Sequence, residues 1–186
     1  MNSEKAFAAS SGVGAIGRNM GSFEQADAQG AYVVECLDAD GNLRWREEIK
    51  NLVTTAGKND ALDKYLAGSG YTATWYLGLI SSTSYTTGPA VGDTAASHAG
   101  WTEDQGYSQG ARPTAAFAAA AAGAKALSSA AVFTMNASTT IKGCFLIANS
   151  TKGGTTGVLY SAGLFSGGDK VMQSGDTLNV SYTASL

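Results

Sequence analysis

The sequence predicts a mainly β protein, a β-sandwich or jelly-roll-like barrel of about eight strands with one short helix and an extended N-terminal arm. Three observations lead to this fold class. The chain has 24 glycines but only two prolines, which suits many tight turns. Residues 31–50 have the pattern of a β-hairpin, and strand-like segments separated by short Gly-rich turns follow one another from residue 131 onward.

Length and composition predict a single β-rich domain over residues 31–186 and an arm over residues 1–30. Hydrophobic residues make up 44% of the 186 positions, which is enough for a buried core. Charged residues make up 15%, and 17 of the 27 lie within residues 1–65. The rest of the chain therefore relies on Ser, Thr, Asn and Gly for solubility, or buries much of its surface against partners.

Several functional classes lack their sequence signals. The net charge is −3 and no Lys/Arg cluster exists, so no nucleic acid partner is expected. No apolar run approaches the roughly 18 residues of a membrane span, and no signal peptide directs secretion. Cys36 and Cys144 each lie in an apolar stretch and are expected as buried thiols. One histidine and two distant cysteines offer no zinc site, and no cofactor is expected.

Residues 1–30 are dominated by Gly and Ala and contain few bulky apolar side chains. Such a segment cannot offset its own ordering entropy, so we expect it to lie on a neighbouring subunit. The expected partner contacts are the large side chains of this arm and one tryptophan of a later loop: Phe7, Ile16, Arg18, Met20, Phe23 and Trp101.

The hairpin over residues 31–50 consists of "AYVVECLDA" and "NLRWREEIK" around Asp40-Gly41, a strong turn signal. Alternation in the second strand predicts one face with Leu43, Trp45 and Glu47, and the opposite face with Arg44, Arg46 and Glu48.

One helix is expected next, capped by Thr54 or Thr55 and ended by Gly68, with Leu52 and Val53 stapling its start. Asp60 and Lys64 are spaced for an i,i+4 ion pair. The predicted inner face consists of Ala61, Leu62, Tyr65 and Leu66.

The middle of the chain is less regular. Residues 73–80, "ATWYLGLI", predict a central buried strand, and a loop over residues 81–112 follows. Loops of this length are usually functional. Residues 115–131 are Ala-rich and interrupted by Gly123; we expect a weak strand or extended segment, with a helix as the alternative because Ala is the best helix former. Five strands complete the domain: "AVFTMNA", "TIKGCFLIA", "GVLYSAGLF", "KVM" and "TLNVSYTASL".

The long loop contains residues that resemble an active site. His98, the only histidine, lies near Asp93, Glu103 and Asp104, and residues 106–110 match G-x-S-x-G around Ser108. In α/β-hydrolases that motif follows a strand, precedes a helix and comes before its histidine, and none of these conditions holds here. A serine hydrolase using Ser108 and His98 is therefore a distant alternative.

A structural interpretation of the same loop is favoured. His98 is expected on a short helical turn capped by Asp93. The three carboxylates lack the D-x-D-x-D-G spacing of a calcium loop. Trp101 is expected either as an interface anchor or as a core residue.

Four segments form a distinctive combination: "ADGNLRWREEIKNLVTTAGKNDALDKYL", "TWYLGLI", "GDTAASHAGWTE" and "GVLYSAGLFSGGDKVMQSGDTLNVSYTASL". Together they resemble small virion structural proteins of tailed bacteriophages. The resemblance covers residues 31–186 and implies a structural part of the phage particle with no catalytic residues. It implies synthesis in the host cytoplasm and a final location on the virion.

Within that class we expect a capsid cement or decoration protein, with the major capsid protein as partner and self-association, as a trimer. The first alternative is a tail-associated or fibre-base structural protein. Copy number on the particle separates the two.

Overall fold

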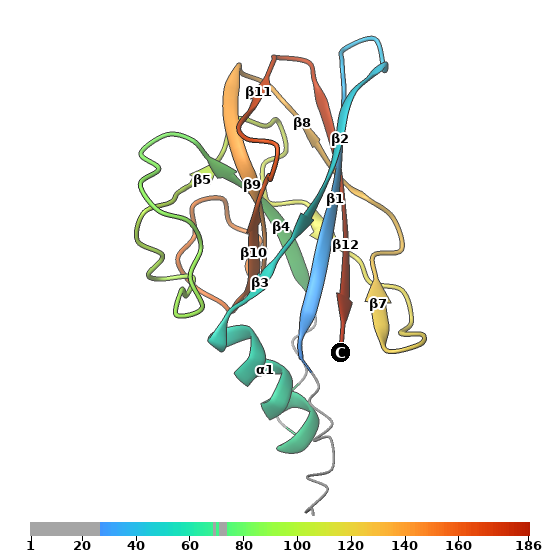
Figure 1. The fold of residues 1–186 in the computed structure, drawn as a ribbon, viewed down its shortest axis with the longest axis vertical. Coiled ribbons are helices and arrows are strands. Elements are labelled where there is room, and N and C mark those ends of the chain that lie inside the picture. Colours follow the sequence, from blue (N-terminus) through green and yellow to red (C-terminus); the bar gives the residue numbers. More distant parts are fainter. Residues whose placement is uncertain (1–26, 69, 71–73) are drawn as a thin grey trace, which may run out of the picture.

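The computed structural model describes residues 27–68, 70 and 74–186 (Figure 1). The predicted arm contacts Phe7, Ile16, Arg18, Met20 and Phe23 lie outside these residues. Strand β1 (Gln29–Leu37) begins two residues before the predicted start of the domain at residue 31, because Gln29 and Gly30 already pair with Ser185 and Ala184.

Two antiparallel sheets face each other, and the predicted mainly β fold is confirmed. The first sheet, here sheet A, has the order β2 (Leu43–Lys50), β1 and β12 (Thr177–Ser185), with β7 (Ala124–Ala126) and β8 (Ala131–Thr134) both beside β12. The second, sheet B, has the order β3 (Leu52–Val53), β10 (Leu159–Leu164), β9 (Thr139–Ile147), β4 (Trp75–Ser81) and β5 (Glu103–Asp104). Strand β6 (Thr114–Ala115) pairs with β4, and β11 (Lys170–Met172) pairs with β9.

The described residues form 12 strands, against about eight predicted. The extra ones are the two- and three-residue strands β3, β5, β6 and β7, which are too short to show a periodic pattern.

The main core lies between the two sheets. Alternate residues of β1 and β12 point inward and face each other across the ladder, as Tyr32 does with Tyr182. Their rings lie 4.7 Å apart, and the Tyr32 hydroxyl reaches Ser161 Oγ of sheet B at 2.6 Å. Cys36 and Cys144 are free, buried thiols within this core, as the sequence predicts.

A second core covers the opposite face of sheet B. Its members come from the strands of sheet B and from the loop that follows β4: Ile80, Ala95, Trp101, Phe145, Ile147, Leu159 and Ala162. Sheet B is therefore buried on both faces, and its strands show nearly continuous burial rather than alternation.

Helix α1 (Thr55–Leu66) begins as predicted, but the side of the helix that packs on the domain is not the predicted one. Thr54 Oγ1 accepts the Gly57 N–H at 3.0 Å, and the Lys64–Asp60 pair is present at 3.7 Å. Gly57 lies so close to Tyr160 that a Cβ there would be 2.6 Å from the Tyr160 carbonyl oxygen. The helix therefore docks through its first turn. The predicted inner face is wrong, since the structure leaves all four of its residues exposed: Ala61, Leu62, Tyr65 and Leu66.

The Ala-rich segment is extended, and the helical alternative is wrong. Phe117 bridges to Leu127, and Ala121 exchanges backbone hydrogen bonds with Ala124. Ala122 and Gly123, at the tip, have φ of 50° and 74°, which closes a tight hairpin turn. Pairing with β12 overrides the helix propensity of alanine.

The Asp40-Gly41 turn is confirmed, with Gly41 at φ 85°. Asp38 organises it by accepting the backbone N–H groups of Asp40 and Asn42, and the Asn42 bonds lower the pKa of Asp38. Leu43 is 59% exposed rather than inward, because the ladder shifts register between Cys36 and Leu37. Within the described part of the chain, no helix is long and apolar enough to span a membrane.

Candidate functional site

The loop after β4 folds over the outer face of sheet B, and Asp93 holds it in place. Asp93 Oδ2 accepts the Trp101 indole N–H at 2.9 Å and the Ala90 N–H at 3.0 Å. The predicted helical turn capped by Asp93 is wrong: Thr94 and Ser97 instead exchange backbone hydrogen bonds in a non-helical turn. Asp93 is used to satisfy a buried indole rather than a helix end.

Trp101 is only 3% exposed and belongs to the outer core. Its ring centroid lies 5.5 Å from that of Phe145 and 4.1 Å from that of His98. Of the two expected roles, the core role is the one that the structure supports, because so little of Trp101 reaches the surface.

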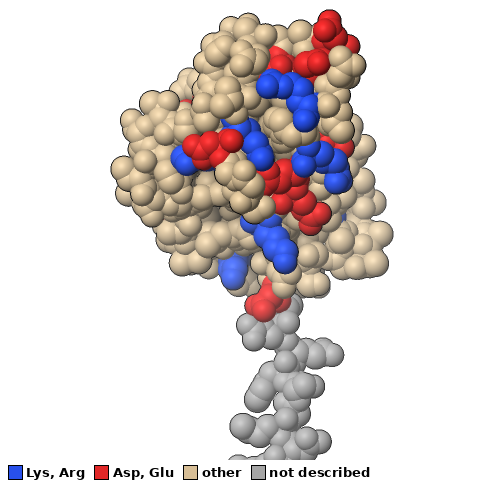
Figure 2. All heavy atoms as spheres, turned by 45° about the horizontal axis from the view of Figure 1, so that its top comes forward, with Lys and Arg blue, Asp and Glu red and all other residues tan. Residues whose placement is uncertain are grey.

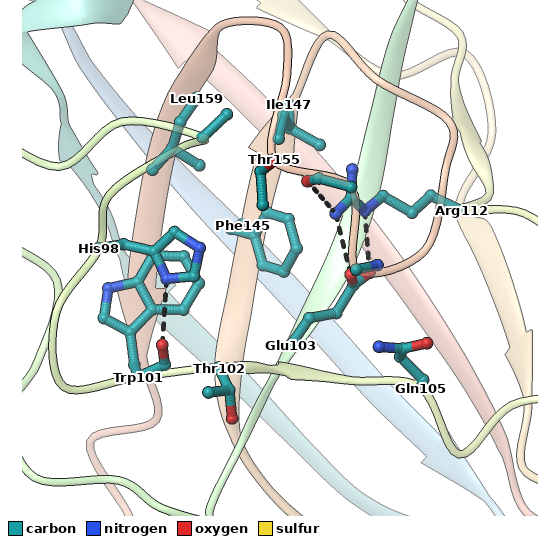
Figure 3. Close-up of a pocket in the computed structure, with 13 residues that line it drawn as sticks. His98, Trp101, Thr102, Glu103, Gln105, Arg112, Phe145, Ile147, Thr155 and Leu159 are labelled. Atoms are coloured by element: carbon teal, nitrogen blue, oxygen red, sulfur yellow. Dashed lines mark hydrogen bonds and ion pairs between the residues drawn. The ribbon is translucent and has the colours of Figure 1, made fainter.

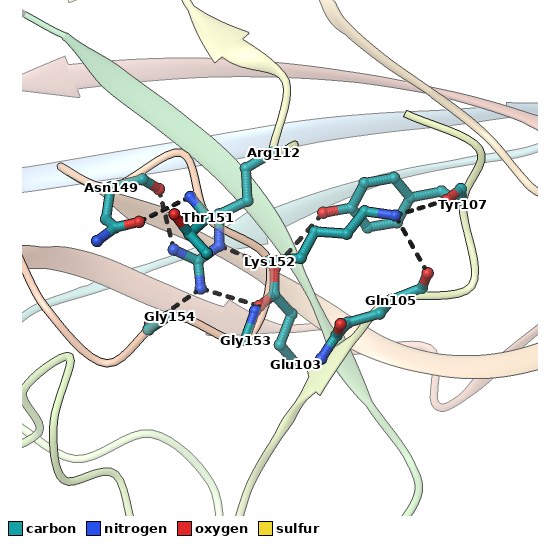
Figure 4. A network of polar contacts seen from close by, with 9 residues as sticks. All are labelled: Glu103, Gln105, Tyr107, Arg112, Asn149, Thr151, Lys152, Gly153 and Gly154. Atoms are coloured by element: carbon teal, nitrogen blue, oxygen red, sulfur yellow. Dashed lines mark hydrogen bonds and ion pairs between the residues drawn. The ribbon is translucent and has the colours of Figure 1, made fainter. Parts of the chain in front are cut away.

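A buried ion pair joins the loop to sheet B (Figure 4). Arg112 binds Glu103 through two parallel bonds of 2.8 and 2.9 Å, and both side chains are at most 6% exposed. The guanidinium also donates to the carbonyl oxygens of Asn149 and Gly154 at 2.9 and 3.3 Å. Arg112 thus ties three segments together. The sequence signal that could have found it is its isolation as the only charged residue between Asp104 and Lys125.

The neighbouring polar residues also have structural partners. Asp104 accepts from the Gly106 N–H at 2.9 Å and from the Thr139 hydroxyl. Lys152 Nζ donates to the Tyr107 carbonyl at 2.7 Å and lies 3.8 Å from the Tyr107 ring centroid. This network fixes the two loops relative to each other.

The residues of the hydrolase alternative are not brought together. His98 Nδ1 is 3.0 Å from the Trp101 carbonyl oxygen, whereas Ser108 is exposed and its N–H donates to Thr134. Asp93 and Glu103 are engaged by Trp101 and Arg112. Among the residues that the structure describes, no group of three or more His, Cys, Asp and Glu is arranged to hold a metal ion.

A cavity of about 250 Å³ remains between the loop and sheet B (Figure 3). Its floor is apolar and buried, and consists of Ala95, Trp101, Phe145, Ile147 and Leu159. Its rim is polar and comes from two loops: His98, Thr102, Gln105, Gly153 and Thr155. The Glu103–Arg112 pair closes one side. An apolar floor with a polar rim is typical of small-ligand sites.

A second surface feature lies on α1. Leu62, Tyr65 and Leu66 are 55%, 88% and 73% exposed and lie within little more than one helical turn. The helix projects from the end of the molecule where β1 begins (Figure 1). Single exposed apolar residues are normal, whereas large contiguous apolar patches are typical of interaction surfaces, which makes this cluster a candidate.

The charged residues, unlike the apolar residues of α1, do not form a patch of one kind. Figure 2 shows Lys and Arg interspersed with Asp and Glu over one face. Charged side chains also pair with one another: Lys170 binds Glu47 and Lys142 binds Asp169, both at 2.6 Å. This face offers no single-sign field to a charged partner.

No protein-family model matches the chain, and no curated protein matches it significantly.

Proposed function

We propose that the protein is a structural component of a bacteriophage virion, a cement or decoration protein that binds the outside of the capsid. The observation that carries this proposal is the exposed apolar face of α1, formed by Leu62, Tyr65 and Leu66. The resemblance of four sequence segments to phage virion proteins supplies the particular setting. The major capsid protein is the proposed partner.

The start of β1 and the segment before α1 meet at one end of the domain. The Asn51 N–H, shortly before α1, donates to the Gly30 carbonyl oxygen at the start of β1, at 3.2 Å. An arm formed by the residues before β1 would therefore leave the domain beside α1. The helix face and the arm would contact the same partner, with Tyr65 as the central anchor because exposed tyrosines are frequent hot spots.

A protein that binds assembled subunits and not dissociated ones stabilises the shell by mass action, and the proposed binding would act in this way. A trimer would contact several capsid subunits at once and gain further affinity from effective concentration. Analytical ultracentrifugation of the purified chain tests the trimer, and a monomer at all concentrations would contradict it.

Capsid binding is the direct test. Capsids that lack the protein are mixed with the purified chain and sedimented. We expect the triple variant Leu62→Ser, Tyr65→Ser, Leu66→Ser to remain in the supernatant, whereas the wild type sediments with the capsids. Val171→Ser is the matched control, since Val171 is 57% exposed on β11, at the opposite end of the domain from α1.

Both variants should melt as the wild type does, because exposed apolar groups contribute little to folding. Normal binding by the triple variant would refute the role of α1. A count of bound copies decides the setting: hundreds on the head support the cement role, and a dozen or fewer at the tail would support a tail component instead.

The arm is tested separately by deleting residues 1–26, which leaves β1 intact. We expect a folded domain whose melting temperature is unchanged and which no longer binds capsids. Full binding by the shortened chain would show that the arm is dispensable.

A further inference from the structure

We propose that the cavity between the loop and sheet B binds a neutral sugar, one pyranose ring at a time. The residues that line the cavity are different from those of the exposed α1 face, so the sugar site does not depend on whether the protein coats a capsid. It depends on the size of the cavity, on its lack of net charge and on the placement of its polar groups.

The size of the cavity suits a single ring. Its volume is about 250 Å³, just below the roughly 300–1,000 Å³ of sites for drug-sized ligands. A water occupies about 30 Å³ in the liquid, so the cavity takes a ligand larger than a few waters and smaller than a nucleotide.

The ion pair makes the cavity electrically neutral. Glu103 and Arg112 are the only charged residues that line it in the described part of the chain. The N–H groups of Arg112 donate to Glu103 and to two backbone carbonyl oxygens, and Glu103 also accepts the Gly153 N–H. Neither side chain has a free charge to offer, so a charged ligand would lose its hydration without gaining a counterion.

The rim has unfilled hydrogen-bonding capacity. A carbonyl oxygen only accepts, so the His98 nitrogen facing Trp101 carries the hydrogen, and in the neutral ring Nε2 presents a lone pair. Figure 3 shows Nε2 directed toward the cavity. Among the described residues, the Gln105 amide and the Thr155 hydroxyl form no hydrogen bond with protein groups. Together these groups offer acceptors and donors to hydroxyls.

A pyranose matches both halves of this surface. Its hydroxyls can reach His98, Gln105 and Thr155 on the rim, while its ring covers the small part of the floor at Phe145, Ile147 and Leu159 that the cavity leaves open. A purely apolar ring would take the rim groups out of water without giving them partners, which costs affinity. A ligand with this few atoms binds with a dissociation constant on the order of millimolar.

The test is a titration of the ¹⁵N-labelled full chain followed by NMR. Glucose, galactose and N-acetylglucosamine are added as free sugars, as methyl glycosides and as short oligosaccharides. We expect at least one to shift the Trp101 indole N–H signal saturably at millimolar concentration, because Trp101 lines the cavity. Binding of the free sugar alone indicates a soluble sugar. Binding of the glycosides and oligosaccharides as well indicates the end of a glycan chain.

Two conservative variants localise the binding. Gln105→Ala and Thr155→Val each remove one exposed rim group and should weaken binding about 2- to 10-fold, the value of one hydrogen bond, with the fold intact. Gln109→Ala is the matched control, because the Gln109 amide bonds Thr134 outside the cavity. Sugar affinity that is unchanged in both rim variants, or no saturable shift with any of the sugars, would overturn the proposal.

Discussion

The two sheets are made from similar residues but are buried in different ways. In sheet A, β1 and β12 alternate between buried and partly exposed residues, because only the inner face is covered. In sheet B, β4 has five consecutive buried residues, because the loop after it covers the outer face as well. The difference shows that the long loop is a third layer of the domain. The cavity lies between this layer and the sheet, beside the Glu103–Arg112 pair.

The burial of the loop explains why so many of its polar side chains form hydrogen bonds. A loop that buries its backbone must supply partners for it, and Arg112, Asp93 and Asp104 do so. Sheet A needs no such residues on its outer face, where solvent satisfies side chains directly.

The largest expected effect comes from the ion pair that anchors the loop. Arg112→Met should lower the free energy of unfolding by about 3–5 kcal/mol, because Glu103 is left buried and unpaired. Chemical denaturation measures the loss. Arg112→Lys is the control, because it keeps the charge but not the bidentate geometry. Its free energy of unfolding should lie between those of the wild type and Arg112→Met. If Arg112→Met costs under about 1 kcal/mol, the loop is not anchored in this way.

A matched pair of isoleucines on β9 tests whether the outer core is a full part of the fold. Ile141 lies in the core between the sheets and Ile147 in the core under the loop, and both are at most 2% exposed. Each change to Ala should cost about 2–5 kcal/mol. Val33→Ala, on the partly exposed face of β1, should cost far less. A small loss for Ile147→Ala alone would mean that the loop opens independently of the sandwich.

Alkaline pH should lower the stability of the fold through titrating groups in the core between the sheets. Burial raises the pKa of Cys36 to about 11 and that of Tyr182 to about 12, and it also raises the pKa of Tyr32. The unfolded chain therefore loses these protons first, near pH 8.5 for Cys and 10 for Tyr. Stability should be complete below about pH 8 and fall as the pH rises toward 11.

The unfolding midpoint in denaturant, measured from pH 7 to 10.5, checks this expectation. Cys36→Ala should reduce the slope above pH 9 by about 1 kcal/mol per pH unit, the contribution of one proton. Val33→Ala, which removes no titrating group, should keep the wild-type slope. The same slope in Cys36→Ala and wild type would show that Cys36 is already accessible to solvent.

The parts of the fold that could be predicted are those in which a local pattern decides the structure. The Asp40-Gly41 hairpin, the Thr54 cap and the C-terminal strands follow from turn chemistry and from alternation. Which side of α1 is buried could not be predicted. Its apolar residues indicate a buried face, but no part of the described domain covers them. Propensity also misleads in the Ala-rich segment, where pairing with β12 decides the conformation.

The cavity could be predicted from the sequence less completely than the fold could. The loop, Glu103, His98 and Trp101 all stand out by residue type and position. The partners of Arg112 and Phe145 could not be predicted, because they lie 9 and 44 residues away along the chain and meet only through the pairing of β4, β5 and β9. Contacts of this kind depend on tertiary register, which no local pattern contains.

The most local effect is expected at the tip of the Ala-rich hairpin. Gly123 has φ of 74°, and a Cβ there would meet only the Leu186 carbonyl oxygen, at 3.4 Å. Gly123→Ala should therefore cost about 1–2 kcal/mol from backbone strain alone, with no steric clash. Gly110→Ala is the control, since Gly110 has open space around its Cβ position and no positive φ. Thermal unfolding measures both.

Because the tip lies at the edge of sheet A, its strain should leave the loop and the cavity of sheet B unchanged, and the Trp101 indole signal should not move. A shift of that signal in Gly123→Ala would show that the two sheets respond as one unit.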